Sequence, residues 1–233
     1  MKKNISVLLM VSCFVTLLLA ACKPVSVNQY SELATQVQDE IVVGASQFSQ
    51  YLPLLKDKRV GLVVNQTSRV NNLHLVDALL AKGVNVAMIF APEHGFRGDH
   101  DAGASVENSV DSKTGITVHS IYGKNKQPSS DIMANVDIVL FDIQDVGVRF
   151  YTYLSTLHYV MEAAAENDIP VIVLDRPNPN GAYIDGPVLE AEFTSFVGLH
   201  PVPLVYGMTI GEYGKMINGE GWLRGGIAAD LIV

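Results

Sequence analysis

The sequence contains little cysteine. Only Cys13 and Cys22 occur in 233 residues, and both lie near the N-terminus. This excludes a small fold held together by disulfides and leaves the rest of the chain without a thiol for nucleophilic or metal chemistry. Basic residues are also few, because 16 lysines and arginines stand against 24 aspartates and glutamates. A nucleic-acid-binding protein needs a basic face, so this charge balance argues against nucleic acid as a partner.

Several motifs that identify common enzymes are missing. The sequence has no GxGxxG and no GxxxxGK[ST], so we expect no dinucleotide or nucleoside triphosphate and no other cofactor. It has no GxSxG, which disfavours a serine esterase. It also has no HExxH, and we expect no metal. A metal-dependent hydrolase that uses Glu93, His94, His100 and Asp101 is an alternative, although their spacing matches no standard zinc pattern.

The N-terminus has the pattern of a secretion signal. Lys2 and Lys3 precede an apolar run over residues 5–21, which predicts a signal peptide over residues 1–21. Small residues directly before Cys22 resemble a bacterial lipobox, so we expect cleavage there and acylation of Cys22. Residues 22–56 are then a lipid-anchored tether and lead-in with a short helix at 31–38. The expected location is the bacterial cell envelope, at the periplasmic face or outer membrane; an uncleaved anchor or an ordinary signal cut elsewhere is the alternative.

From residue 57 onward, apolar runs alternate with helical patterns. Strands are expected at 59–64, 84–90, 116–122, 136–141 and 170–174, and helices at 73–82, 130–134, 150–167 and 209–218. Asn71 or Asn72 is expected to cap the first helix, and Thr209 with Glu212 forms a possible capping box for the last. The alternation predicts an α/β domain over 57–222, with a Rossmann-like, doubly wound, mostly parallel sheet and helices on both faces. A further apolar run near the end suggests that 223–233 begin a truncated C-terminal domain.

Polar residues follow the carboxyl end of each strong strand. Ligands bind at this edge of parallel α/β sheets, so we expect a polar crevice there. Its members follow four strands: Asn65, Gln66, Thr67 and Ser68; Glu93, His94 and Arg97; Asp142, Gln144, Asp145 and Arg149; Asp175, Arg176, Asn178 and Asn180.

Glu93 is the leading catalytic candidate in this crevice. A glutamate at a strand end acts as a general acid when its surroundings hold a proton on it near neutral pH. Arg97 could orient a carboxylate or a sugar oxygen, or it could form a purely structural pair with Glu93. Asp145 could instead cap the helix that starts near residue 150. Tyr151 or Tyr153 could stack on a sugar or belong to the core.

Four segments together resemble the NamZ-like exo-β-N-acetylmuramidases, a family long catalogued as a domain of unknown function. They are VGLVVNQTSRV (60–70), FAPEHGFRGD (90–99), VLFDIQDVGVRFYTY (139–153) and VLDRPNPNGAYIDGP (173–187). The resemblance implies a Rossmann-like domain followed by a smaller one, and glycoside hydrolysis of peptidoglycan fragments. It implies Glu93 as the catalytic residue, with His94, Asp142 and Asp145 in the same motifs. The residues it implies for substrate binding are Asn65, Gln66, Thr67, Arg97, Gln144, Arg149, Tyr151, Asp175, Arg176 and Asn178.

The sequence therefore predicts a lipid-anchored glycosidase that releases N-acetylmuramic acid from the non-reducing end of peptidoglycan fragments. Glycoside hydrolysis commonly uses two carboxyl groups, and the partner of Glu93 could be Asp142, Asp145, Asp175 or the acetamido group of the substrate. The lactyl carboxylate of the sugar needs a cation, for which Arg97, Arg149 and Arg176 are the candidates. The alternative is a truncated lipoprotein that binds a muropeptide or disaccharide without hydrolysing it.

Overall fold

The computed structural model describes residues 41–98, 101 and 107–233. The chain divides into two units, Met1–Ile41 and Val42–Val233, and the second contains the fold. The expected signal peptide, Cys22 and the expected helix at 31–38 lie outside the described residues. Within the described part of the chain, every helix is too short or too polar to cross a membrane.

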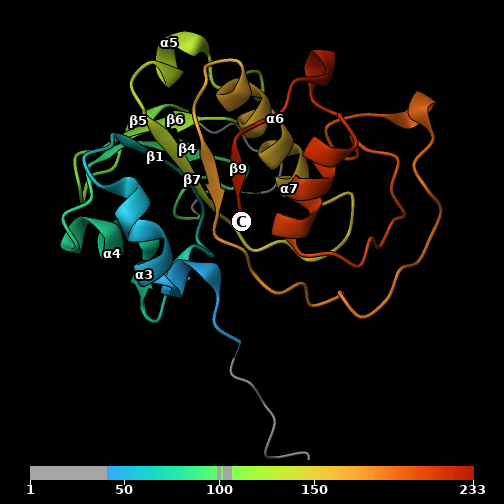
Figure 1. Cartoon of the computed structure of the whole chain (residues 1–233), viewed down its shortest axis with the longest axis horizontal. Helices are drawn as coiled ribbons and strands as arrows, with labels where there is room; N and C mark the ends of the chain where they lie inside the picture. The colour runs from blue at the N-terminus through green and yellow to red at the C-terminus, as the bar shows by residue number, and fades with distance from the viewer. Residues whose placement is uncertain (1–40, 99–100, 102–106) are drawn as a thin grey trace, which may run out of the picture. The chain divides into compact units, whose positions relative to one another are not determined.

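The centre of the fold is a seven-stranded sheet with the order β5-β6-β4-β1-β7-β8-β9 (Figure 1). Neighbouring strands run parallel except at one edge, where β5 pairs antiparallel with β6. The strands are β1 (Val60–Val64), β4 (Val86–Ala91), β5 (Ser109–Val110), β6 (Thr117–Ser120), β7 (Ile138–Asp142), β8 (Val171–Val173) and β9 (Leu231–Ile232). A separate small hairpin joins β2 (Arg69–Val70) to β3 (Leu73–His74). This mixed, mostly parallel α/β sheet confirms the predicted fold class.

Alternate side chains of the central strands enter two different hydrophobic cores. In β1, Leu62 belongs to one core and Val63 to the other, as the period-two geometry of a strand requires. Helices α6 and α7 cover the face of Val63, and α3 and α4 cover the face of Leu62 (Figure 1). The helices are α3 (Phe48–Tyr51), α4 (Leu75–Ala81), α5 (Ser130–Met133), α6 (Tyr153–Ala165) and α7 (Ile210–Gly219), with short 3-10 turns at Gly44–Ser46, Leu52–Leu55, Ala191–Phe193 and Arg224–Gly226.

Helix starts show where sequence patterns were sufficient. The capping box of α7 is confirmed, because Thr209 Oγ1 accepts from the backbone N–H of Glu212 while the Glu212 carboxylate accepts from that of Thr209. The cap of α4 is His74 rather than an asparagine, since the β2–β3 hairpin occupies the preceding residues. Helix α6 begins at Tyr153, well beyond Asp145, so Asp145 does not cap it.

The compact unit Val42–Val233 includes residues on both sides of the expected domain. On the N-terminal side, Ala45, Tyr51 and Leu55 are buried in the core with α4. On the C-terminal side, residues 223–233 supply β9, which pairs with β8 and satisfies backbone groups that would otherwise be exposed at a sheet edge.

Candidate functional site

The sheet order brings the predicted polar segments to one edge. The strands β4, β1, β7 and β8 are consecutive neighbours and all parallel, so their carboxyl ends lie side by side. In the register, Val64 stands opposite Asp142 and Phe141 opposite Val173. The segments that start at Asn65, Pro92, Ile143 and Leu174 therefore leave the sheet together.

Glu93 lies in a tight turn directly after β4. The backbone N–H of Gly95 donates to the carbonyl of Pro92, and His94 and Gly95 both have positive φ angles, 69° and 77°. The left-handed region is uncommon for a residue with a side chain, so this turn holds half-buried His94 and its neighbour Glu93 in defined positions.

Two hydroxyl groups hold the Glu93 carboxylate. Tyr122 OH donates to Oε1 at 2.9 Å, and Thr152 Oγ1 donates to Oε2 at 2.7 Å. Tyr122 follows β6 and Thr152 precedes α6, so the half-buried carboxylate joins three segments that are distant in sequence. Each oxygen therefore accepts a hydrogen bond from a hydroxyl group, and these bonds orient the carboxylate.

Tyrosines surround this carboxylate in their protonated form. Burial is the main cause that raises the pKa values of Tyr122, Tyr151 and Tyr153, and the charge of Glu93 raises them further. The pKa of Tyr153 rises to about 12. Tyr151 is half-buried, packs edge-on against Tyr153 at 4.9 Å between ring centroids, and also feels the charge of Asp145. At neutral pH these phenols stay protonated, so they do not act as phenolate nucleophiles.

Asp142 and Arg176 form a buried ion pair. Nε of Arg176 lies 2.6 Å from Oδ1 of Asp142, and Nη2 lies 2.9 Å from Oδ2. Asp142 is fully buried, which raises the pKa of its carboxyl, and the guanidinium opposes that rise. Both carboxylate oxygens are therefore taken by a protein partner.

Among the described residues, one oxygen of Asp145 has hydrogen-bond partners and the other has none. Its Oδ2 accepts from the backbone N–H of Gly147 at 2.8 Å and from the hydroxyl of Tyr206. Its Oδ1 is buried and has no hydrogen-bond partner among the described residues. Burial raises the pKa of this carboxyl, and the hydrogen bonds from Tyr206 and from backbone N–H groups oppose the rise.

Asp175 and Asn178 connect loops to one another. Oδ1 of Asp175 accepts from the backbone N–H of Gly211 at 2.8 Å and Oδ2 accepts from Thr209 Oγ1 at 2.6 Å, so this carboxylate binds the start of α7. Asn178 donates to the carbonyl of Met208 at 2.8 Å. A Cβ atom on Gly147 would lie 2.2 Å from Oδ1 of Asn178, so only glycine fits there.

The segment after β1 is built around a buried asparagine. Oδ1 of Asn65 accepts from the backbone N–H of Thr67 at 2.9 Å, and Thr67 Oγ1 accepts from the backbone N–H of Gln144 at 3.0 Å. Gln144 donates through Nε2 to the carbonyls of Asp145 and Pro177. Nδ2 of Asn65 is buried without a hydrogen-bond partner among the described residues, whereas Gln66 is exposed. The segment thus ties the ends of β1 and β7 together.

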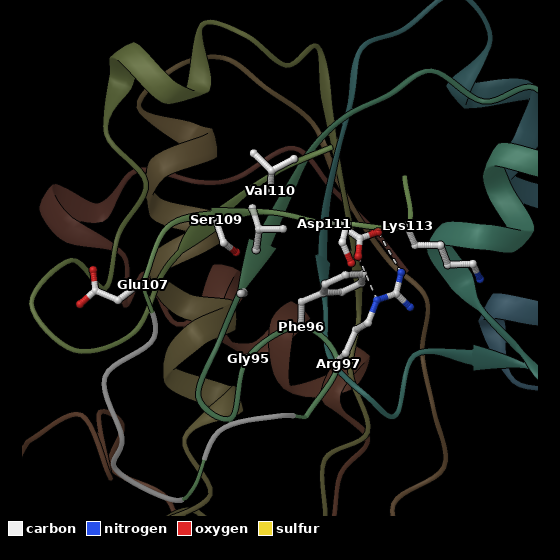
Figure 2. A pocket seen from close by; sticks show the side chains of 11 residues that line it. Gly95, Phe96, Arg97, Glu107, Ser109, Val110, Asp111 and Lys113 are labelled. Atoms are coloured by element: carbon white, nitrogen blue, oxygen red, sulfur yellow. Dashed lines mark hydrogen bonds and ion pairs between the residues drawn. The ribbon is translucent and has the colours of Figure 1, made fainter. Parts of the chain in front are cut away.

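Arg97 lies at the edge of a cavity of about 550 Å³ beside β4, β5 and β6. Figure 2 shows its guanidinium bound to both oxygens of Asp111, at 3.1 Å from Nε and 2.9 Å from Nη2. This pairing and hydrogen bonds from Thr114 and the backbone lower the pKa of Asp111, although its burial acts in the opposite direction. Arg97 also lies over the ring of Phe96.

Arg149 supports the long loop that follows β8. Its Nη1 donates to the carbonyls of Pro187 and Val202, and its backbone N–H donates to the carbonyl of Leu204. Each of the three arginines proposed to bind substrate therefore has partners within the protein.

The residues of the alternative metal site are only partly described. His100 lies outside the described residues. Among the residues that are described, no group of three or more histidine, cysteine, aspartate or glutamate side chains is placed to hold a metal ion.

Four residues that position the predicted candidates escaped the sequence analysis. Tyr122 and Thr152 bind Glu93, Asp111 binds Arg97, and Tyr206 binds Asp145. Tyr122 could have been found, because it follows β6 at the same edge of the sheet. Asp111 and Tyr206 follow no local pattern, because their partners Arg97 and Asp145 lie many residues away in sequence.

Fold and site together define an α/β protein with a carboxylate-containing polar site at the carboxyl edge of its sheet. The chain belongs to the family described as "Exo-beta-N-acetylmuramidase NamZ, N-terminal", whose model matches residues 60–233. It is 47% identical over 211 residues to "Peptidoglycan beta-N-acetylmuramidase NamZ" of Bacillus subtilis (strain 168), an alignment that covers 89% of this chain and 50% of that protein.

Two solved structures of DUF1343 family proteins from Bacteroides fragilis NCTC 9343 share the fold. One has a TM-score of 0.75 and 46% identity, covering 82% of this chain and 50% of the other. The second has a TM-score of 0.74 and 41% identity, covering 81% and 48%. The chain therefore spans about half the length of the relatives that it matches.

Proposed function

We propose that this chain carries the catalytic acid of a glycoside hydrolase that releases N-acetylmuramic acid from the non-reducing end of peptidoglycan fragments. The observation that carries the proposal is the Glu93 carboxylate, held by Tyr122 and Thr152 at the sheet edge where ligands bind in α/β folds. The similarity to a peptidoglycan β-N-acetylmuramidase supports this substrate class.

Asp145 is the proposed partner of Glu93. Asp142 and Asp175 each have both oxygens bound by protein donors, which leaves them no oxygen to offer a sugar without breaking a structural contact. Asp145 retains one oxygen, Oδ1, without a protein partner among the described residues; this oxygen is buried, so it would act on the sugar through its charge. In this scheme Glu93, in its protonated form, gives its proton to the leaving-group oxygen as the bond between that oxygen and the anomeric carbon breaks. Asp145 or the acetamido group of the substrate stabilises the positive charge that develops at the anomeric carbon, and water then attacks this carbon.

The test is hydrolysis of a chromogenic β-N-acetylmuramide by the wild-type chain and by a Glu93→Gln variant. Loss of a general acid lowers kcat by roughly 100-fold or more. Glu192→Gln is the matched control, because Glu192 is exposed in the 3-10 turn Ala191–Phe193, and the kcat of this variant should equal that of the wild type. Full turnover by Glu93→Gln would remove Glu93 from the mechanism. Sugar binding without turnover by the wild type would instead identify a binding module.

We also propose that the protein is exported and anchored through acylated Cys22, as an envelope protein acting on peptidoglycan would require. The support is the sequence alone, in which small residues precede Cys22 after an apolar run. Labelling with a radioactive fatty acid in a bacterial host should mark the wild type and leave a Cys22→Ser variant unlabelled. Equal labelling of both would contradict the anchor.

A further inference from the structure

The proposed substrate carries a carboxylate, and the three arginines expected to bind it are already bound within the protein. N-acetylmuramic acid differs from N-acetylglucosamine by a lactyl group whose carboxylate needs a positive partner. Arg97 is bound to Asp111, Arg176 to Asp142, and Arg149 to two backbone carbonyls. Recruiting any of these arginines would break a contact that supports the fold, so another cation close to Glu93 is a better candidate.

Lys126 is connected to Glu93 through two aromatic rings. Tyr122, whose hydroxyl binds the Glu93 carboxylate, has its ring centroid 6.0 Å from that of Phe196. Nζ of Lys126 lies 5.0 Å from the centroid of Phe196. Within residues 41–98, 101 and 107–233, no carboxylate forms an ion pair with Lys126. The cation–π attraction holds the ammonium over the ring face, and its three N–H donors remain able to bind an anion.

The aromatic surface beneath Lys126 is fixed from several directions. Ser195 and Gly198 exchange two backbone hydrogen bonds of 2.9 Å, which closes a tight turn with Phe196 inside it. Ser155 on α6 donates to the carbonyl of Phe196 at 2.6 Å. The Phe196 ring stacks on Tyr159 of α6, with an interplanar angle of 16°.

The loop that carries Lys126 is also held. The neighbouring Gln127 donates to the Glu166 carboxylate at 3.0 Å and accepts from Arg224 at 3.2 Å. Phe196, Tyr122 and Lys126 are all half-buried, so each retains an exposed part that a ligand can contact. Rigid aromatic faces with one cation at the rim are the features that bind a sugar ring with an acidic substituent.

We propose that Lys126 binds the lactyl carboxylate of N-acetylmuramic acid, with Phe196 and Tyr122 as the surface against which the sugar lies. This inference rests on the proposed function and assigns the residue that selects the muramic sugar. It makes Lys126 a binding and specificity residue, which acts on substrate affinity and not on the chemical step.

Binding of free N-acetylmuramic acid and free N-acetylglucosamine, measured by calorimetry at low and moderate salt, tests the assignment. The wild type should prefer N-acetylmuramic acid, and Lys126→Met should bind it about tenfold more weakly, as loss of one charge-assisted hydrogen bond implies. Binding of N-acetylglucosamine should not change. Lys126→Arg should recover most of the preference, because it restores the cation.

Lys124→Met is the control, because Lys124 lies exposed two residues away on the same loop. Its preference for N-acetylmuramic acid should match the wild type. An unchanged preference in Lys126→Met, or an equal loss for both sugars, would overturn the role of Lys126 while leaving the proposed hydrolase intact. Failure of the wild type to bind either sugar would overturn both proposals.

Discussion

Asp142, at the end of β7, and Arg176, in the loop after β8, face each other in a bidentate ion pair with both side chains buried. The sequence motifs predicted that both residues lie at a substrate site, and in the structure their side chains bind each other. Arg176 also donates to the carbonyl of Arg69, so the pair connects the β2–β3 hairpin to the sheet. The pair therefore supports the edge on which Glu93 and Asp145 are placed.

Removing one partner of this pair should be costly. In Asp142→Asn the Arg176 guanidinium stays buried without its counter-charge, and we expect a loss of about 3–5 kcal/mol in the free energy of unfolding, measured with urea. Asp137→Asn is the comparison, because Asp137 pairs with Arg59 at the exposed surface and should contribute far less. Similar losses in the two variants would show that the buried pair is not a main support.

The hydroxyl groups that bind Glu93 should affect turnover more than affinity. Thr152→Val and Tyr122→Phe each remove one hydrogen bond to the carboxylate, and we expect each to lower kcat about tenfold with little change in KM. Thr156→Val removes a similar hydroxyl one turn further along α6, and in the described part of the chain this hydroxyl donates to the carbonyl of Thr152 and not to Glu93. Steady-state kinetics in which all three variants behave alike would argue against positioning of Glu93.

Gly147 should tolerate no side chain. Its φ is +78°, and an added Cβ would collide with the amide of Asn178, so Gly147→Ala suffers both backbone strain and overpacking. Gly115→Ala is the control for backbone strain alone, because Gly115 has a φ of +74° and no atom of the described residues lies within 4 Å of its Cβ position. We expect Gly147→Ala to lose about 1–3 kcal/mol more than Gly115→Ala in thermal or urea unfolding. Equal losses would mean that the Asn178 loop moves aside freely.

A buried histidine pair should make the fold sensitive to acid. Nε2 of His200 lies 3.0 Å from Nδ1 of His158, Tyr213 OH contacts the other His200 nitrogen, and Glu162 and Arg224 lie beyond His158. Burial lowers the pKa of both histidines. The pKa of His200 falls to about 3, and the charge of His158 is the second cause. At His158, Glu162 partly opposes the decrease in pKa.

The sign of the pH effect follows from where the protons bind. Unfolded histidines take up protons below about pH 6.5, whereas the folded pair takes them up only at lower pH, so stability is complete above pH 6.5 and falls as pH decreases. We expect about 1–2 kcal/mol of loss from His200 between pH 6.5 and 5, and His158 acts in the same direction. Urea unfolding of His200→Gln should show a weaker pH dependence than the wild type, and an unchanged slope would contradict the assignment.

The architecture was largely predictable because it depends on local patterns. Buried parallel strands give continuous apolar runs, and helices such as α6 give a repeating apolar face, so both can be read without knowing the partner segments. The capping box at Thr209 is equally local. The small hairpin before α4 and the pairing of β9 were not predictable, since two-residue strands have no period of their own.

The polar edge of the site was predictable for the same reason, but the roles within it were not. The position of a residue at a strand end predicts that it lies near a ligand, but it does not predict which side chain or backbone group the residue will bind. Asp142, Asp145 and Asp175 look alike in sequence, and they differ because Arg176, Tyr206 and the start of α7 approach them from distant segments.

The order of apolar and polar residues by itself determined the α/β fold and the edge where chemistry is expected, because hydrophobic periodicity is written in consecutive residues. Only the tertiary structure decided that Asp142 belongs to an ion pair, that Tyr122 and Thr152 hold Glu93, and that Lys126 lies over Phe196. Hydrogen bonds and ion pairs act over a few ångströms, and residues separated by tens of positions come that close only when the sheet, the helices and the loops have folded together.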